Sequence, residues 1–485
     1  MPAAKWGEPL VEADGLRVWL RTPAEVPAGA GAGSALFVHG AAVHADRPIR
    51  ALELAGGGPS RPAMATAMPS PGLAAELADP GAANAILWGI VPLDPGPAPA
   101  ALTLTARLDG GGLARLELPL TAAGPPTEPV AGSGAAIAIA MATIEPPQGL
   151  LERQLESLRA QTRDDWTCVI SDDGSTDEAF ARLERAIGRD RRFVVSRAPE
   201  RRGAYANFAR ALAMVPAEAE YVALCDQDDR WHPDKLETLV GALGEARLAF
   251  ADMRVVGADG APISDTYWTS RRPNHESFAS LLLGNSVTGA AALFRRELLD
   301  DALPLPPRAG NLYHDHWLAL VAAATGGIAY VDRALHDYVQ HADAVVGHAG
   351  ANRGVVGGGF ARRLAGLRHR DSAELLAEWR RIYFAEYCRM ALTAAALDRR
   401  LGGRLGKTRR RAIERALAAD RSPAALAWLA GRQLRRLRRD DTGGSEAGML
   451  RGLAWRRSVR RRGGDADLPP GIVGAELSFP AERPA

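Results

Sequence analysis

From residue 136 the sequence alternates short apolar runs with helical stretches, and this alternation restricts the fold more than any other feature. Such alternation is typical of a mostly parallel sheet with helices on its faces. Acidic clusters directly follow two of the apolar runs. Because ligands of such sheets bind at the carboxyl ends of the strands, both clusters are candidate site residues. The strands are predicted at 136–142, 166–170, 193–196 and 221–225.

The flanking regions have different patterns. Residues 1–122 show period-2 runs between turns rich in Gly and Pro, which predicts a β-sandwich. The Pro- and Gly-rich residues 123–134 predict a linker. We therefore expect a multidomain chain with an N-terminal all-β sandwich (1–122), the linker, a central α/β domain (135–357), a basic α-helical domain (358–463) and a flexible tail (464–485).

The cluster Asp226-Gln227-Asp228 has the residue types of a metal site. Two carboxylates one residue apart can share a divalent cation, and Mg²⁺ and Mn²⁺ prefer oxygen ligands together with substrate phosphates. The same residues could instead form a solvated turn before the helix that begins near Pro233, because Asp is a favoured helix N-cap. The spacing leaves both interpretations open.

The cluster at 171–177 also has two interpretations. A carboxylate such as Asp172 can accept a hydrogen bond from the ring N–H of uracil or thymine, and Gly174 permits a tight turn beneath a base. Alternatively, Ser175, Thr176 or Asp177 caps the next helix. Only the context along the chain separates the two.

That context resembles the family 2 glycosyltransferases over about 210 of the 485 residues. The motifs occur in order along residues 136–348, and the last two are similar to those of bacterial rhamnosyltransferase-like members. They lie at 136–142, 151–162, 171–177, 202–209, 226–236, 285–289, 294–296, 313–319 and 338–347.

The resemblance implies a glycosyltransferase A (Rossmann-like) fold for the central domain and an inverting transfer. It assigns the nucleotide to Asp172, Asp173, Thr143, Glu145, Arg202, Asn207 and Asp226. It assigns Mn²⁺ or Mg²⁺ to Asp226, Asp228 and His341, the general base to Asp315, and support of the acceptor side to Gly289, His314 and Trp317. His314 stands where many relatives carry Glu, and Glu145 where relatives often carry Asn.

We therefore expect transfer of a sugar from a pyrimidine nucleotide sugar, dTDP-rhamnose or a UDP-hexose, to a glycan or lipid-linked acceptor in surface polysaccharide synthesis. A single displacement inverts the anomeric configuration and needs no enzyme nucleophile, and we recognise no Ser/His/Asp or Cys/His pattern. The alternative is a non-catalytic carbohydrate-binding or scaffolding protein with a degenerate transferase domain. The presence of Asp226, Asp228 and Asp315 argues against it.

The net charge of +2 conceals a basic C-terminal region. Residues 361–463 contain 27 Arg and Lys but 10 Asp and Glu. A peripheral contact with an anionic membrane surface is one interpretation, and a set of well-solvated helices is the other. Nucleic acid is not expected, because the segment lacks interleaved aromatic residues and a recognised module.

The cysteines Cys168, Cys225 and Cys388 are far apart and form no CxxC pair, which favours a reducing compartment. We see no signal-peptide pattern and no run of the ~18–20 apolar residues that span a membrane. The expected location is the cytoplasm, with the inner face of the membrane as the peripheral option.

Overall fold

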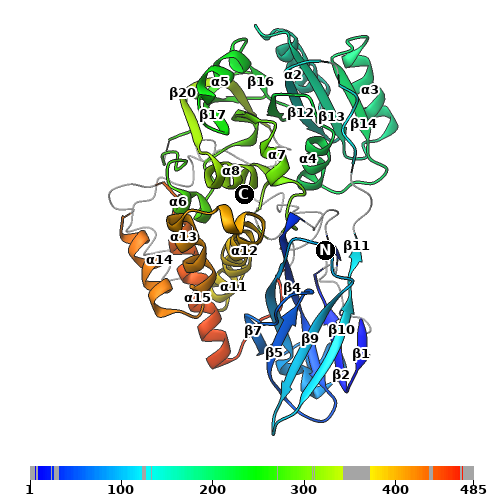
Figure 1. Ribbon diagram of the computed structural model, residues 1–485, viewed down its shortest axis with the longest axis vertical. Helices are drawn as coiled ribbons and strands as arrows, with labels where there is room; N and C mark the ends of the chain where they lie inside the picture. Colours follow the sequence, from blue (N-terminus) through cyan, green and yellow to red (C-terminus); the bar gives the residue numbers. More distant parts are fainter. Residues whose placement is uncertain are drawn as a thin grey trace.

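The computed structural model describes residues 6, 9–22, 25–26, 32–122, 127–132, 134–269, 271–308, 310, 312–341, 372–435, 441–469 and 472. The expected motif at 345–347 and the start of the helical pattern at 361 lie outside these residues. The β-rich N-terminal region, the central α/β region and the C-terminal helices lie side by side (Figure 1).

Residues 11–119 form two antiparallel sheets that share one hydrophobic core. Leu102, Leu104 and Ala106 are buried in alternation along one strand, so one face of that strand lies against the other sheet. The first sheet has the order β1 (Val11–Ala13), β2 (Leu16–Leu20), β4 (Ser34–His44), β8 (Ile86–Leu93) and β7 (Ala65–Met68). The second has the order β10 (Leu113–Pro119), β9 (Ala101–Leu108), β5 (Ile49–Ala55) and β6 (Arg61–Pro62). The predicted all-β region is thus partly matched, and a short parallel pair, β3 (Glu25–Val26) and β11 (Thr121–Ala122), was not expected.

The central region contains one mixed sheet. Its order is β14 (Phe193–Arg197), β13 (Trp166–Asp172), β12 (Ile137–Thr143), β15 (Tyr221–Cys225), β19 (Ala292–Arg295), β17 (Leu248–Gly257), β20 (Ile328–Gln340) and β16 (Arg230–Trp231), with β18 (Pro262–Ser264) beside β17. The first four strands are parallel and β19 runs antiparallel to both of its neighbours. The predicted strands are therefore present, within a sheet that is mixed.

Helices cover both faces of this sheet. Ile137 and Ile139 of β12 belong to the same core as α2 (Gln148–Arg159), α3 (Asp177–Ile187) and α5 (Lys235–Leu243). Ala138 and Ala140 belong to the core that contains α4 (Ala204–Ala213), α6 (Phe278–Leu283) and α8 (His314–Thr325). Burial on both faces explains the continuous apolar sequence of β12.

The sheet brings both acidic clusters to one edge. Thr143 at the end of β12 pairs with Asp172 at the end of β13. Met141 of β12 pairs with Cys225, the residue before Asp226. Because these strands are parallel, their carboxyl ends meet at the same edge.

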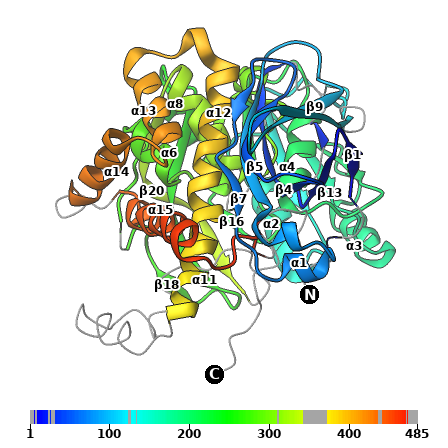
Figure 2. The same ribbon diagram turned by 90° about the horizontal axis from the view of Figure 1, so that it is seen from below.

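The C-terminal helices connect the other two regions. They are α11 (Ser372–Ile382), the π-helical η4 (Tyr383–Cys388), α12 (Arg389–Leu401), α13 (Lys407–Ala418), α14 (Pro423–Arg435) and α15 (Ser445–Arg462). Helix α12 contacts β4 and β8 on one side and α6 and α8 on the other (Figure 2). The predicted C-terminal helical region is confirmed. Within the described ranges, no helix combines the length and apolar content needed to cross a membrane.

The described part of the predicted tail makes specific contacts. The backbone N–H of Ala466 donates to the carbonyl of Pro69, and Asp467 pairs with Arg21 at 3.1 Å. Residues 465–467 therefore lie against the N-terminal region.

Candidate active site

Asp172 holds the turn at the end of β13. Its Oδ1 accepts a hydrogen bond from the backbone N–H of Ser175 (2.9 Å), and its Oδ2 accepts from the hydroxyls of Ser175 (2.6 Å) and Thr143 (3.1 Å). Gly174 has φ +71°, and a Cβ there would lie 3.2 Å from the backbone of Arg201. Asp172 is fully buried, so its contacts in this structure are with the turn.

Asp173 holds the next loop of the same edge. Its two oxygens accept hydrogen bonds from the backbone N–H groups of Arg202 (2.8 Å) and Gly203 (2.7 Å), directly before α4. Asn207, in α4, donates to the carbonyl of Thr143 at 3.0 Å. The structure thus brings Thr143, Asp173, Arg202 and Asn207 together, with the Arg202 side chain exposed.

Glu145 holds the N-cap residue of a helix. Its carboxylate accepts hydrogen bonds from the backbone N–H (2.6 Å) and the hydroxyl (3.1 Å) of Thr176, the N-cap residue of α3. Its own N–H donates to the Ser175 hydroxyl at 2.8 Å, and its φ is +39°. The sequence interpretation gave this residue to the nucleotide and missed its contact with the N-cap residue.

The Asp226–Asp228 turn approaches the end of β20. Asp228 Oδ2 lies 2.8 Å from His341 Nε2, so two of the three predicted metal ligands are in contact. Loss of solvation raises the pKa of Asp226, and the charges of Asp228 and Asp315 raise it further. A cation at this position would offset that repulsion.

In the part of the chain that the structure describes, no three Asp, Glu, His or Cys side chains are grouped as a complete metal site. Mg²⁺ is commonly held by one or two carboxylates together with substrate phosphates. Asp228 and His341, which are in contact, are the part of the predicted donor set that could share a cation with a diphosphate.

Gln227 is a site residue that sequence reasoning missed. Its amide donates to the carbonyl of Ile144 (3.1 Å) and accepts from the N–H of Ile144 (2.9 Å). These two bonds fix the Asp226–Asp228 turn to the end of β12. Its position in the sequence, between the two carboxylates, is the feature that could have identified it.

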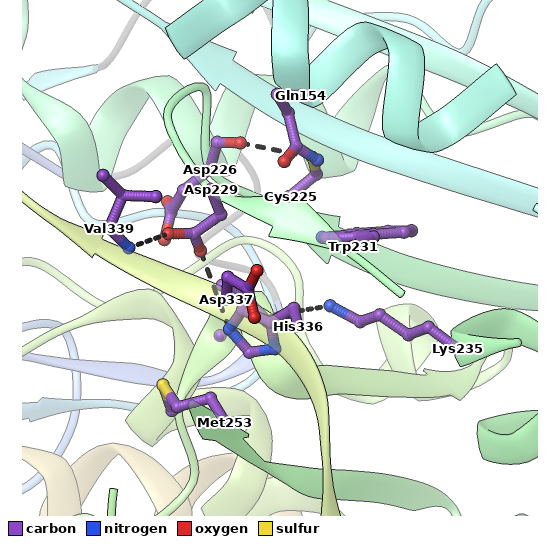
Figure 3. A network of polar contacts seen from close by, with 12 residues as sticks. Gln154, Cys225, Asp226, Asp229, Trp231, Lys235, Met253, His336, Asp337 and Val339 are labelled. Atoms are coloured by element: carbon purple, nitrogen blue, oxygen red, sulfur yellow. Dashed lines mark hydrogen bonds and ion pairs between the residues drawn. The ribbon is translucent and has the colours of Figure 1, made fainter. Parts of the chain in front are cut away.

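A buried network behind the turn was also not predicted (Figure 3). Asp229 Oδ1 accepts a hydrogen bond from the N–H of Val339 at 3.2 Å, and Oδ2 lies 3.6 Å from His336 Nε2. Lys235 donates to the carbonyl of Ala290 and lies 3.9 Å from the ring centroid of Trp231. Burial raises the pKa of Asp229 and lowers that of Lys235. The network joins the acidic turn to β20, which leads to His341.

Asp315 lies in the first turn of α8. Its Oδ1 accepts from the amide of Asn285 (3.1 Å), and its Oδ2 accepts from the N–H of Gly289 (3.0 Å) in the 3₁₀ turn η3 (Gly289–Ala291). Burial raises the pKa of Asp315 to about 6, against the opposing effect of these donors. The carboxylate is thus held in place and still ionised at neutral pH.

The residues predicted to support the acceptor side lie beneath Asp315. His314 stacks on Phe208 with ring centroids 3.7 Å apart, and burial lowers its pKa to about 3, so it is neutral. A Cβ at Gly289 would lie 3.0 Å from His314 Nε2, which explains a glycine there. Trp317 is fully buried and donates to the carbonyl of Ala302 at 2.8 Å, so it supports α8 from the core.

Comparison with known proteins finds similarity within the central region. Residues 141–303 match the family model described as glycosyl transferase family 2. A protein of Bacillus subtilis named as a teichuronic acid biosynthesis glycosyltransferase, TuaG, is 33% identical over 115 residues, which cover 23% of this chain and 45% of TuaG. An uncharacterized glycosyltransferase of Nostoc is 28% identical over 202 residues, which cover 39% of this chain and 61% of the relative.

The chain spans about half the length of the curated relatives it matches. Among solved structures, S. aureus TarS 1–349 in complex with UDP-GlcNAc aligns with a TM-score of 0.38 at 16% identity, over 67% of this chain and 91% of TarS 1–349. The matched residues 141–303 include both acidic clusters, so the likeness to glycosyl transferase family 2 lies in the segment that carries the candidate site.

Proposed function

We propose that the protein is a metal-dependent inverting glycosyltransferase. Its donor is a pyrimidine nucleotide sugar, dTDP-rhamnose first and a UDP-hexose second, and its acceptor is a glycan or lipid-linked glycan. The name of one relative, a teichuronic acid biosynthesis glycosyltransferase, supports a role in surface polysaccharide synthesis. The observation that carries the proposal is the position of Asp315, held by Asn285 and Gly289 and close enough to Asp226 to raise the pKa of Asp226.

Asp315 acts as the general base in this proposal. An acceptor hydroxyl is a poor nucleophile at neutral pH, so a carboxylate must remove its proton as the new C–O bond forms. The hydrogen bonds from Asn285 and Gly289 orient the carboxylate. Its pKa of about 6 leaves it ionised at neutral pH and makes it a stronger base than an ordinary Asp carboxylate.

The donor lies along the edge formed by residues 143–145, 172–173 and 202–207. Asp173 and Asp172 fix the two loops that would surround the nucleoside. Asp226, Asp228 and His341 would hold Mn²⁺ or Mg²⁺. When bound, the cation would stabilise the negative charge that develops on the leaving diphosphate.

We further propose that exposed basic residues of α13 contact an anionic membrane surface. Lys407, Arg410, Arg411 and Arg415 are exposed on this helix. Each such side chain near an anionic surface contributes about 1 kcal/mol to binding. Vesicles with and without anionic lipid would test this contact in a flotation assay.

The test of the main proposal is thermal stability against UDP and dTDP, with and without Mn²⁺ or Mg²⁺. A ligand at a hundredfold excess over Kd stabilises the folded state by about 2.7 kcal/mol. We expect a metal-dependent rise in Tm for one nucleotide that Asp228→Asn abolishes. The matched control is Asp46→Asn, because Asp46 is exposed in the bend between β4 and β5 of the N-terminal region. This variant should keep the rise in Tm. No rise with either nucleotide would reject the transferase proposal and favour the non-catalytic glycan-binding scaffold.

A further inference from the structure

Arg308 is a partly buried arginine that makes no hydrogen bond or ion pair with the described residues. Its Nε is buried without a partner, and its guanidinium carbon lies 5.8 Å from the ring centroid of Tyr313. Burial lowers the pKa of Arg308, and the other groups that act on this pKa are the hydroxyls of Tyr313 and Tyr205 rather than a carboxylate.

The buried Arg400 uses its guanidinium to donate to three backbone carbonyls, and two further arginines with little exposure have a carboxylate partner. Arg247 lies 2.5 Å from Asp301, and Arg456 lies 3.8 Å from Asp420. A charge removed from water is costly unless it is paired. Arg308 therefore has unused capacity for an anion.

The segment that carries Arg308 is fixed on both sides. The Tyr205 hydroxyl donates to the carbonyl of Pro306 at 2.8 Å, and the Arg400 guanidinium donates to the carbonyl of Pro304 at 2.7 Å. The N–H of Gly310 donates to the carbonyl of Ile472 at 3.1 Å. These contacts fix the backbone on both sides of Arg308, and this restricts the positions that its side chain can reach.

Tyr313 links Arg308 to the candidate site: burial raises the pKa of Tyr313, the nearby charge of Arg308 lowers it and that of Asp315 raises it. Tyr205 follows Gly203, whose N–H is held by Asp173 on the nucleotide side. Tyr313 is the N-cap residue of α8, two residues before Asp315, and provides no side-chain cap. In the first turn of α8, the N–H of His316 donates to Asp315.

We propose that Arg308 binds an anionic group of the substrate, a phosphate or a carboxylate, beside Asp315. This inference rests on the proposed function, because the anion is assigned to the substrate of that same site. Guanidinium groups bind such groups through two parallel hydrogen bonds. The anion comes from one of two sources, the diphosphate of the donor or an acidic group on the acceptor.

The experiment compares the wild type with Arg308→Met by calorimetric titration of the full chain. Methionine keeps an apolar stem against Tyr313 and removes the charge, and because no ion pair is lost we expect a Tm equal to or above that of the wild type. Arg61→Met is the control, since Arg61 is exposed in β6 of the N-terminal sheets and has no role in the proposed site. The probes are UDP, dTDP, uridine, inorganic phosphate, and glucuronate added to the nucleotide-saturated protein.

If Arg308 binds the donor, the Kd of the nucleoside diphosphate rises at least tenfold in Arg308→Met while the Kd of uridine does not change. If it binds the acceptor, phosphate or glucuronate binds the nucleotide-saturated wild type and this binding is lost in the variant. Equal Kd values within twofold for every probe, or a wild type that binds no anion, would overturn the inference. A wild type that binds phosphate through Arg308 but no nucleotide would reject the proposed function and keep the anion site.

Discussion

Asp315 is a single carboxylate whose surroundings define its chemistry. It is held by Asn285 and Gly289, and its pKa is raised by burial. We predict that Asp315→Asn lowers kcat by about 10²–10⁴-fold, because a positioned base contributes a factor of that size. The Kd for the nucleoside diphosphate should stay within about threefold of the wild type, as measured by titration. If the variant lost catalysis and nucleotide binding together, the result would indicate a structural role for Asp315.

The same residue sets a prediction for pH. The pKa of Asp315 is about 6, above its ordinary value of 3.8, so the carboxylate becomes protonated as the pH falls through 6. A protonated Asp315 cannot remove the proton of the acceptor hydroxyl. We therefore expect kcat/KM to fall on the acid side with an apparent pKa near 6. A rate profile measured from pH 5 to 8 at constant ionic strength checks this. A flat profile would contradict the assignment of Asp315 as the base.

At this scale the sequence predicts residue types well and contacts poorly. Asp172, Asp226 and their neighbours could be found because each cluster directly follows an apolar strand. The bonds of Gln227 to Ile144 and of Lys235 to Ala290 could not be found, because they join distant parts of the chain. The pairing of β12 with β15 creates the first contact and the packing of α5 on the sheet creates the second, and no local pattern encodes either.

At the scale of single elements, Glu145 stabilises the start of α3. We predict that Glu145→Ala lowers the free energy of unfolding by about 1 kcal/mol, the usual net contribution of a hydrogen bond, because it removes the acceptor that holds the N-cap residue Thr176. Urea unfolding measures this change. The control is Glu178→Ala in the same helix, where an exposed pair with Arg182 contributes about 0.5 kcal/mol or less. Equal losses in the two variants would contradict this role.

The turn η3 connects the base to the helix that carries it. In Gly289→Ala the new Cβ would lie 3.0 Å from His314 Nε2 and 3.4 Å from Asp315 Cβ, so the turn must shift. We expect kcat to fall by about tenfold or more, because small displacements of catalytic groups are costly. Gly241→Ala is the control, since a Cβ there meets nothing within 4 Å. Unchanged steady-state kinetics for Gly289→Ala would contradict the importance of this turn.

The long, strongly patterned elements could be predicted to within a residue or two. The strand expected at 136–142 is observed as Ile137–Thr143, and that expected at 221–225 matches β15. The antiparallel β19 and the two-residue β16 make the sheet mixed, and the hydrophobic periodicity of the sequence did not predict either strand. Strands of two residues have no repeat to detect, and strand direction depends on the connections between elements.

At the scale of the whole molecule, charge counting overstated the basic surface of the C-terminal region. Arg389 and Arg400 are buried and donate to backbone carbonyls, and Arg432 and Arg456 lie near carboxylates. Only part of the excess positive charge is therefore exposed, chiefly on α13 and at the end of α15. A sequence count cannot separate arginines that join regions from arginines that face solvent. The domain boundaries at 122, 134, 357 and 463 stay predictions.

Arg400 shows how α12 joins the three regions. Its Nε donates to the carbonyl of Gly33 at 3.0 Å, and its Nη1 donates to those of Ala302 (2.6 Å) and Pro304 (2.7 Å). The guanidinium carbon also lies 5.3 Å from the ring centroid of Trp317. One side chain on α12 therefore contacts the N-terminal sheets and the central region together.

We predict that Arg400→Met lowers the free energy of unfolding by about 2–4 kcal/mol, because it removes charge-assisted hydrogen bonds and takes the arginine donor from the carbonyls of Gly33 and Pro304. The neighbouring Arg399→Met is the control. Arg399 pairs with Asp94 at 2.9 Å and with Asp398 at 2.7 Å, and 28% of its side chain is exposed, so its loss should cost less than about 1 kcal/mol. Urea unfolding followed by tryptophan fluorescence measures both. If Arg399→Met cost as much as Arg400→Met, the surface pairs rather than the buried guanidinium would hold the regions together.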